Sequence, residues 1–171
     1  DIPSGIPDLT PMRVVVQPVY ADRLEPVLAT DHWLPLPAPA HLPDSLLPTD
    51  PVTFGDTIRL LATESALENT TLDLTLYWQS TAEAPPDLQV FVHILDRTGT
   101  IVAQQDARPM QDRYPFHVMP RDIIVQDQRR LAINTLPPGE YRVIVGIYRL
   151  SDQTRLWVNG AETSQTDHAE V

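Results

Sequence analysis

Hydrophobic and polar residues alternate along the chain from Phe54 onward, with the period of two that predicts β-strands. The segment 71–79 shows the alternation most clearly. Its inward positions hold three leucines and Trp78, and its outward positions hold Thr71, Asp73, Thr75 and Tyr77. Two other segments, Leu88–Asp96 and Glu140–Leu150, carry too many β-branched and aromatic residues for surface strands. We therefore expect them to be central strands.

Shorter strand patterns occupy residues 56–63, 101–106, 122–133 and 155–158, with turn residues between them. A chain of about eight short strands without an amphipathic helix predicts an all-β fold, a two-sheet antiparallel β-sandwich. Its expected form is Ig-like or fibronectin-III-like, with a jelly roll as the alternative. The run Leu136–Tyr141 supports the Ig-like form, because it has the spacing of a tyrosine corner. Tyr141, Trp78 and Phe91 are expected in the core.

The N-terminal part of the chain differs in composition, since residues 1–51 contain 11 of the 18 prolines. Proline fixes φ and lacks a backbone donor, so we expect residues 1–53 to form an arm or linker with one possible edge strand near 12–17. Its apolar residues indicate that it packs on the sandwich. The β-sandwich domain is assigned to residues 54–158, and residues 159–171 form a polar tail that we expect to fray.

Charge and cysteine content exclude several classes of function. A net charge of −11 and a pI near 4.6 argue against nucleic acid, whose phosphates need clustered cations. The absence of cysteine excludes disulfides, thiolate catalysis and cysteine-ligated zinc. The sequence has no apolar run long enough to span a membrane and no signal peptide. Because it begins at Asp1, we interpret it as a piece of a longer protein.

Catalytic chemistry is not predicted at any position, and neither a metal site nor a cofactor is expected. The five histidines lack metal-ligand spacing, and His93 is interpreted as a core residue. Aromatic residues on outward or loop positions could stack on sugar rings, which makes a glycan the candidate ligand. The alternative is that these residues pack within the fold. The predicted ligand-binding residues are Tyr77, Tyr114, His117 and Trp157.

Several motifs occur in a fixed order that resembles a known family. They are Phe54-Gly-Asp-Thr-Ile-Arg-Leu-Leu61, Leu74-Thr-Leu-Tyr-Trp-Gln79, Val90-Phe-Val-His-Ile-Leu-Asp96, Val102-Ala-Gln-Gln-Asp106 with Pro109, Tyr114-Pro115, and Leu136-Pro-Pro-Gly-Glu-Tyr-Arg-Val-Ile-Val-Gly-Ile-Tyr148. This order resembles the C-terminal β-sandwich domain of bacterial multi-pass membrane proteins of the glycosyltransferase-like, mannosyltransferase-like class, many of them uncharacterised. The likeness covers roughly residues 54 to 158.

The resemblance implies a non-catalytic, extracytoplasmic accessory or interaction domain attached to the membrane through segments absent from this chain. Its expected partner is a cell-surface glycan or the membrane-embedded part of its own protein. A purely structural or protein-interaction module is the alternative, and a carboxylate-dependent glycoside hydrolase is a further one. The family's Tyr-Pro loop usually continues with Trp and Pro-Gly-Glu, whereas this chain has His117-Val-Met-Pro-Arg-Asp122. If that loop binds a ligand in the family, we expect this chain to bind it differently or not at all.

Overall fold

The computed structural model describes residues 12–14, 32–34, 40–43, 46, 51–158 and 167–171. The chain divides into two compact units, residues 1–38 and 39–171. In the first unit, β1 (Met12–Val14) pairs antiparallel with β2 (His32–Leu34). β1 lies within the segment near 12–17 where one edge strand was thought possible. Its residues 15–17, and most of the arm whose packing on the sandwich was predicted, lie outside the described residues.

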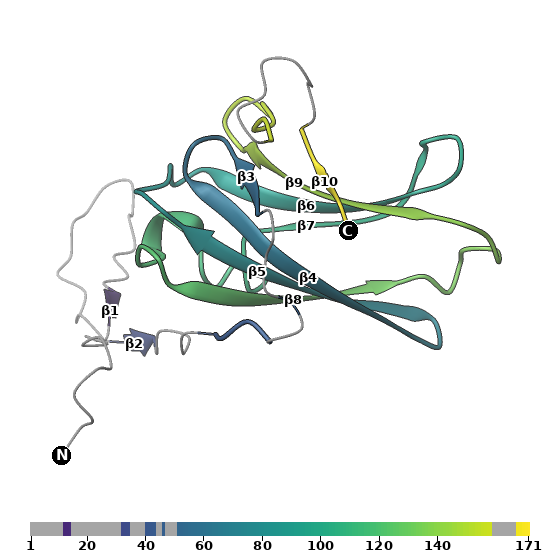
Figure 1. The fold of residues 1–171 in the computed structure, drawn as a ribbon, viewed down its shortest axis with the longest axis horizontal. Helices are drawn as coiled ribbons and strands as arrows, with labels where there is room; N and C mark the ends of the chain where they lie inside the picture. Colours follow the sequence, from purple (N-terminus) through teal and green to yellow (C-terminus); the bar gives the residue numbers. More distant parts are fainter. Residues whose placement is uncertain (1–11, 15–31, 35–39, 44–45, 47–50, 159–166) are drawn as a thin grey trace, which may run out of the picture. The chain divides into compact units, whose positions relative to one another are not determined.

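The second unit contains the predicted all-β fold, a β-sandwich of two four-stranded antiparallel sheets (Figure 1). One sheet has the strand order β3-β4-β5-β8, and the other has the order β10-β9-β6-β7. The strand bounds are β3 (Val52–Phe54), β4 (Ile58–Glu68), β5 (Thr71–Ser80), β6 (Leu88–Leu95), β7 (Ile101–Ala107), β8 (Ile124–Ala132), β9 (Arg142–Arg149) and β10 (Ala169–Glu170).

The order in which the chain visits the two sheets is Ig-like. The hairpin β4–β5 lies in one sheet and the hairpin β6–β7 in the other, after which β8 returns beside β5 and β9 beside β6. In an immunoglobulin-type sandwich, β4, β5 and β8 would have the positions of strands A, B and E, and β6 and β9 those of strands C and F. The tyrosine corner is also present, because the Tyr141 hydroxyl donates a hydrogen bond to the Pro137 carbonyl oxygen at 2.7 Å.

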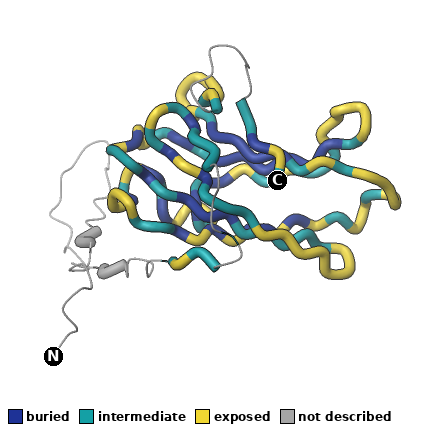
Figure 2. The backbone as a smooth tube through the Cα atoms, in the orientation of Figure 1, coloured by how far each residue is buried: buried dark blue, intermediate teal, exposed yellow. Residues whose placement is uncertain are grey.

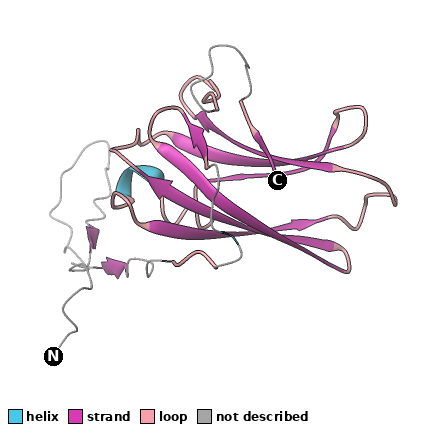
Figure 3. Ribbon diagram, viewed as in Figure 1, coloured by secondary structure: helices cyan, strands magenta, loops and turns pink. Residues whose placement is uncertain are grey.

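The core is most compact at the end of the sandwich where β7 connects to β8. We call this the closed end, and it comprises the loop 107–123 with the side chains beneath it. A short 3-10 helix, Phe116–Val118, lies in this loop (Figure 3). The fully buried Trp78 meets the Phe116 ring edge-on at 5.4 Å between centroids and the Phe54 ring at 5.9 Å. Figure 2 shows buried backbone concentrated toward this end and exposed backbone toward the opposite hairpins.

The C-terminal segments differ from the sequence prediction. Residues 155–158 were expected to form a strand, but they make only isolated bridges, Tyr148 with Arg155 and Phe54 with Val158. The final strand is instead β10, inside the tail that was expected to fray. Its backbone pairs with β9, so the edge of that sheet is hydrogen-bonded over these residues. The intervening residues 159–166 lie outside the described part of the chain.

Two residues expected in the central core have other positions. Phe91 is buried, but it alternates with Val90 and Val92 and so lies on the outer face of its sheet. It is covered there by the Arg155 guanidinium, 4.5 Å from the ring centroid, and it packs against Gly146 of the neighbouring strand. Tyr141 is half-buried because its hydroxyl turns back to the loop that precedes β9.

Candidate functional site

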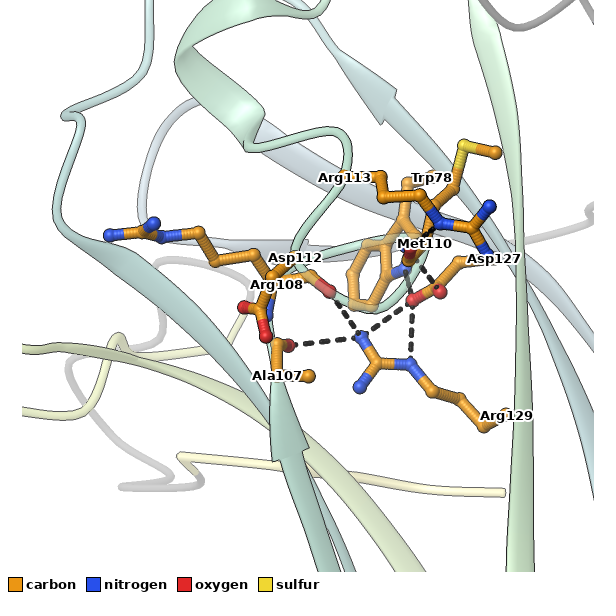
Figure 4. Close-up of polar contacts among 8 residues, drawn as sticks. All are labelled: Trp78, Ala107, Arg108, Met110, Asp112, Arg113, Asp127 and Arg129. Atoms are coloured by element: carbon orange, nitrogen blue, oxygen red, sulfur yellow. Dashed lines mark hydrogen bonds and ion pairs between the residues drawn. The ribbon is translucent and has the colours of Figure 1, made fainter.

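An ion pair inside the sandwich joins the two sheets at the closed end (Figure 4). Asp127 and Arg129 both project inward from β8, and both side chains are completely buried. The Arg129 guanidinium donates to Asp127 Oδ2 through Nε at 2.9 Å and Nη2 at 2.7 Å. Arg129 Nη2 also donates to the carbonyl oxygens of Ala107 and Arg108, at the end of β7 in the opposite sheet. We call Asp127 and Arg129 the inter-sheet clamp.

Asp127 accepts further hydrogen bonds that fix the core and the loop. Its Oδ2 accepts from the Trp78 indole at 3.3 Å, and its Oδ1 accepts from the Met110 backbone N–H at 2.7 Å. A buried carboxylate needs such partners, because an unpaired charge in a protein interior is strongly unfavourable. Of the buried polar atoms of these two side chains, only Arg129 Nη1 has no partner among the described residues. The clamp is therefore almost fully satisfied within the fold and has a structural role.

The loop anchored by the clamp has an unusual backbone. Met110, Gln111 and Asp112 have φ values of 55°, 57° and 67°, the left-handed region that non-glycine residues rarely occupy. The Asp112 carboxylate accepts a hydrogen bond from the Arg108 backbone N–H at 2.9 Å, and Arg113 Nε donates to the Met110 carbonyl oxygen at 3.2 Å. The strain of three successive left-handed residues is thus balanced by local hydrogen bonds and by Asp127.

A second polar cluster lies on the outer face of the β6–β9 sheet. His93 Nε2 is 3.4 Å from Asp106 Oδ1, and the Tyr148 hydroxyl donates to Asp106 Oδ2 at 3.3 Å. Burial lowers the pKa of His93 below 6.5, the nearby Arg155 acts in the same direction, and Asp106 opposes both. His93 Nδ1 is buried without a partner in the described chain. Burial therefore favours the neutral form of the imidazole, and the Asp106 carboxylate favours the protonated form.

The same outer-face cluster attaches the C-terminal strand. Arg155 Nη1 pairs with Asp167 Oδ2 at 3.1 Å, and His168 Nδ1 lies 2.8 Å from Asp167 Oδ1. These contacts lie just before β10, and the Asp167 backbone carbonyl passes over Gly146 of β9. The charges are therefore paired with one another and hold the chain terminus on the sheet.

The opposite end of the sandwich contains an apolar cavity between the sheets. Its volume is about 410 Å³, and it opens between the β4–β5 turn and the loop 133–141. We call it the open-end cleft. Leu67 points toward it, since Leu67 pairs with Leu72 across the hairpin, yet Leu67 is 68% exposed because the other sheet does not cover it. The apolar walls are formed by Leu67, Leu72, Ile94, Ile133, Leu136 and Val143.

Polar groups in the open-end cleft are few and uncharged. Asn69, Thr70 and Asn134 contribute to its lining, and no charged side chain of the described residues does. Among those residues Tyr141 alone lines the cleft with a titratable side chain, and its hydroxyl already donates to the Pro137 carbonyl oxygen. The cleft can therefore contact a ligand, but it contains no group positioned to transfer a proton or attack a bond.

The four predicted ligand-binding residues do not form one site. Tyr77 was expected to face solvent, but it is 3% exposed, and its hydroxyl donates to Glu64 Oε2 at 2.6 Å, which raises the pKa of Tyr77 to about 12. Tyr114 is 5% exposed, and burial raises its pKa. His117 is exposed on the 3-10 helix, and the Trp157 ring is 53% exposed. Stacking of a sugar on Tyr77 or Tyr114 is excluded by their burial in this structure.

Sequence reasoning missed the inter-sheet clamp and the open-end cleft. The clamp had a signal, because Val125 and Leu131 fix the inward face of β8 and place Asp127 and Arg129 on that same face. The cleft had none, since the exposure of Leu67 depends on how far the opposite sheet extends.

The described residues contain no group of three or more His, Cys, Asp or Glu side chains that could hold a metal ion. None of the helices in this part of the chain is long and apolar enough to cross a bilayer. No protein-family model matches the chain, and neither a curated protein nor a solved structure matches it.

Proposed function

We propose that this chain is a non-catalytic accessory domain of a membrane-bound, glycosyltransferase-like protein, and that it binds through the open-end cleft. The setting outside the cytoplasm is inferred from the ordered sequence motifs and their resemblance. The mode of action is inferred from the cleft, whose lining offers apolar contact and neutral hydrogen-bonding groups without an acid, a base or a nucleophile. This composition is the observation that carries the proposal.

The polar clusters outside the cleft support the same conclusion. Asp127 and Arg129 are completely buried and bonded to each other and to the closed-end loop. Asp106 is engaged by His93 and Tyr148, and Asp167 is engaged by Arg155 and His168. A hydrolase needs two carboxyl groups facing each other across a substrate cleft, and these carboxylates serve instead to hold strands and loops together.

Recognition of a glycan at Trp157 is a second candidate function. Its indole ring is the large aromatic group most exposed in the described chain, and sugar rings stack on such surfaces. A single exposed ring gives a smaller contact than the cleft does. This site would act beside the cleft, because Trp157 is not among the cleft residues.

Binding and turnover can be tested on the complete chain labelled with nitrogen-15. We expect no release of nitrophenol from nitrophenyl glycosides over hours, and we expect a saturable ligand to shift the amide resonances of Asn69, Thr70 and Asn134. Turnover that is lost in Asp106→Asn or Asp167→Asn would contradict the proposal. Shifts confined to Trp157 and removed by Trp157→Ala, with maltotriose or mannotriose as the probe, would favour the second candidate.

A further inference from the structure

The open-end cleft has the size and surface of a small-molecule site. Its volume of about 410 Å³ lies within the range of ligand pockets, roughly 300–1,000 Å³, and is too small for a folded partner. Its interior is apolar, with Ile94 and Val143 contributed by one sheet and Leu72 by the other. An apolar chain placed between the sheets would bury these side chains and Leu67, which is otherwise 68% exposed.

The charge of the lining restricts the head group of a ligand. Among the described residues no Arg, Asp, Glu or His lines the cleft, so a phosphate, carboxylate or ammonium group there would find no opposite charge. The net charge of −11 adds a general repulsion against anions. The head group that fits this site is therefore neutral.

The mouth of the cleft offers unused hydrogen-bonding groups. The side chains of Asn69, Thr70 and Asn134 are exposed and make no hydrogen bond with any described residue, although the Thr70 backbone carbonyl accepts from Ile133. Two amides and a hydroxyl can each donate and accept, which matches the hydroxyl groups of a sugar or glycerol. Such a head group would remain at the mouth, where both it and the amides stay hydrated.

We propose that the open-end cleft binds a neutral amphipathic molecule, with its apolar chain between the two sheets and a hydroxyl-rich head group beside Asn69 and Asn134. This inference rests on the proposed binding role of the cleft and assigns the chemical class of its ligand. The cleft requires both parts of such a molecule. The walls select the apolar chain, and the uncharged rim selects the head group.

The experiment compares three probes on the complete chain by nitrogen-15 NMR. Octyl glucoside, below its micellar concentration, has the proposed neutral head and an apolar chain. Sodium octyl sulfate keeps the chain but has a charged head, and glucose is the head alone. We expect octyl glucoside to shift the amides of Asn69, Thr70, Ile133 and Val143 saturably, octyl sulfate to bind at least about tenfold more weakly, and glucose to cause no shift.

Leu67→Asp is the matched test variant, because it places a charge in the apolar wall at an exposed position where folding should be unaffected. It should weaken octyl glucoside binding by about tenfold or more. Leu150→Asp is the control, since Leu150 is also exposed but does not line the cleft. Thermal unfolding of both variants establishes that each is folded.

The possible failures are distinguishable. Equal binding of octyl sulfate, or binding unchanged in Leu67→Asp, would overturn the assignment of a neutral amphipathic ligand to this cleft. Shifts of the cleft amides by glucose or a soluble oligosaccharide, without need for a chain, would overturn the ligand class but leave the cleft as a binding site. The absence of any cleft shift with every probe would overturn both this inference and the proposed function.

Discussion

The two ends of this sandwich differ in what lies between the two sheets. At the closed end, a buried ion pair, a tryptophan and a strained loop fill the space between the sheets, and both carboxylate oxygens of Asp127 accept hydrogen bonds. At the open end, the sheets diverge (Figure 1), leaving an apolar cavity of about 410 Å³ and an exposed Leu67. The contrast indicates that stability is concentrated where the chain crosses between sheets at 107–123. The other end can then keep apolar surface for a ligand.

The largest expected effect is the loss of the inter-sheet clamp. In Arg129→Met the buried Asp127 carboxylate loses its cation, and breaking a buried pair in this way costs about 3–5 kcal/mol of unfolding free energy. The matched control is Arg130→Met, the next residue, whose side chain is 73% exposed and whose solvent-screened pair with Asp73 should contribute little to stability. Urea denaturation measures both.

A second variant separates charge loss from packing loss at the clamp. Asp127→Leu combined with Arg129→Met replaces both charges by apolar groups, which should recover much of the lost stability. Equal unfolding free energies for Arg129→Met and Arg130→Met would show that the closed end does not depend on the clamp.

Much of this architecture could be predicted from sequence, and the clamp shows why part of it could not. Alternation predicted β5, the content of β-branched and aromatic residues predicted β6 and β9, and the tyrosine corner was predicted from the spacing of Leu136–Tyr141 alone. The same alternation makes Asp127 and Arg129 resemble members of a polar surface strand. Only the register of β8 against β5, and the long loop that returns over it, show that they are buried. Val125 and Leu131 indicate the inward face of β8, but the contacts that bury Asp127 and Arg129 are long-range and leave no local pattern.

The candidate site was harder to predict, because exposure depends on what covers a residue. Tyr77 has an outward position by alternation but is buried, whereas Leu67 has an inward position and is exposed. The alternation of residues along a strand tells which face of the sheet a side chain is on. It does not tell whether another segment of the chain covers that face. The predicted aromatic set therefore retains Trp157 and His117 as exposed groups and loses Tyr77 and Tyr114.

The next largest effect is expected in the sheet that contains β6 and β9. A Cβ at Gly146 would overlap the Phe91 ring and lie 2.8 Å from the Asp167 carbonyl oxygen, so Gly146→Ala should cost about 1–3 kcal/mol. Gly139→Ala is the control, because its Cβ would meet only the Tyr141 ring, no closer than 3.5 Å. Thermal or urea unfolding compares them. A neutral Gly146→Ala would mean that Phe91 and β10 are not held against β9.

The open end has a weaker restraint of its own. Tyr141→Phe keeps the ring beside the cleft and removes the hydrogen bond to the Pro137 carbonyl oxygen, which should cost about 0.5–1.5 kcal/mol. Tyr114→Phe is the matched control, since Tyr114 is buried at the closed end and makes no side-chain hydrogen bond with a described residue. Urea denaturation should show a loss in the first variant only. A larger loss in Tyr114→Phe would reverse the assignment of the tyrosine corner.

The smallest expected effect has the opposite sign and examines the strain at the closed end. Gln111 is exposed and has a φ of 57°, so Gln111→Gly should relieve left-handed strain. Glycine also increases the entropy of the unfolded chain, which offsets part of this relief. The net increase in the free energy of unfolding should be about 0.5–1 kcal/mol. Glu83→Gly is the control, because Glu83 is an exposed loop residue without positive φ and should lose stability or stay unchanged.

Combining Gln111→Gly with Arg129→Met tests whether the clamp is what keeps this loop strained. Arg129 holds the carbonyl oxygens of Ala107 and Arg108, and its partner Asp127 holds the Met110 N–H. If these bonds impose the left-handed backbone, releasing Arg129 lets the loop relax, and Gln111→Gly then gains less than it does in the intact protein. Additive effects in this double-mutant cycle would mean that the loop conformation is set by Asp112 and Arg113. The clamp and the loop would then stabilise the closed end independently of each other.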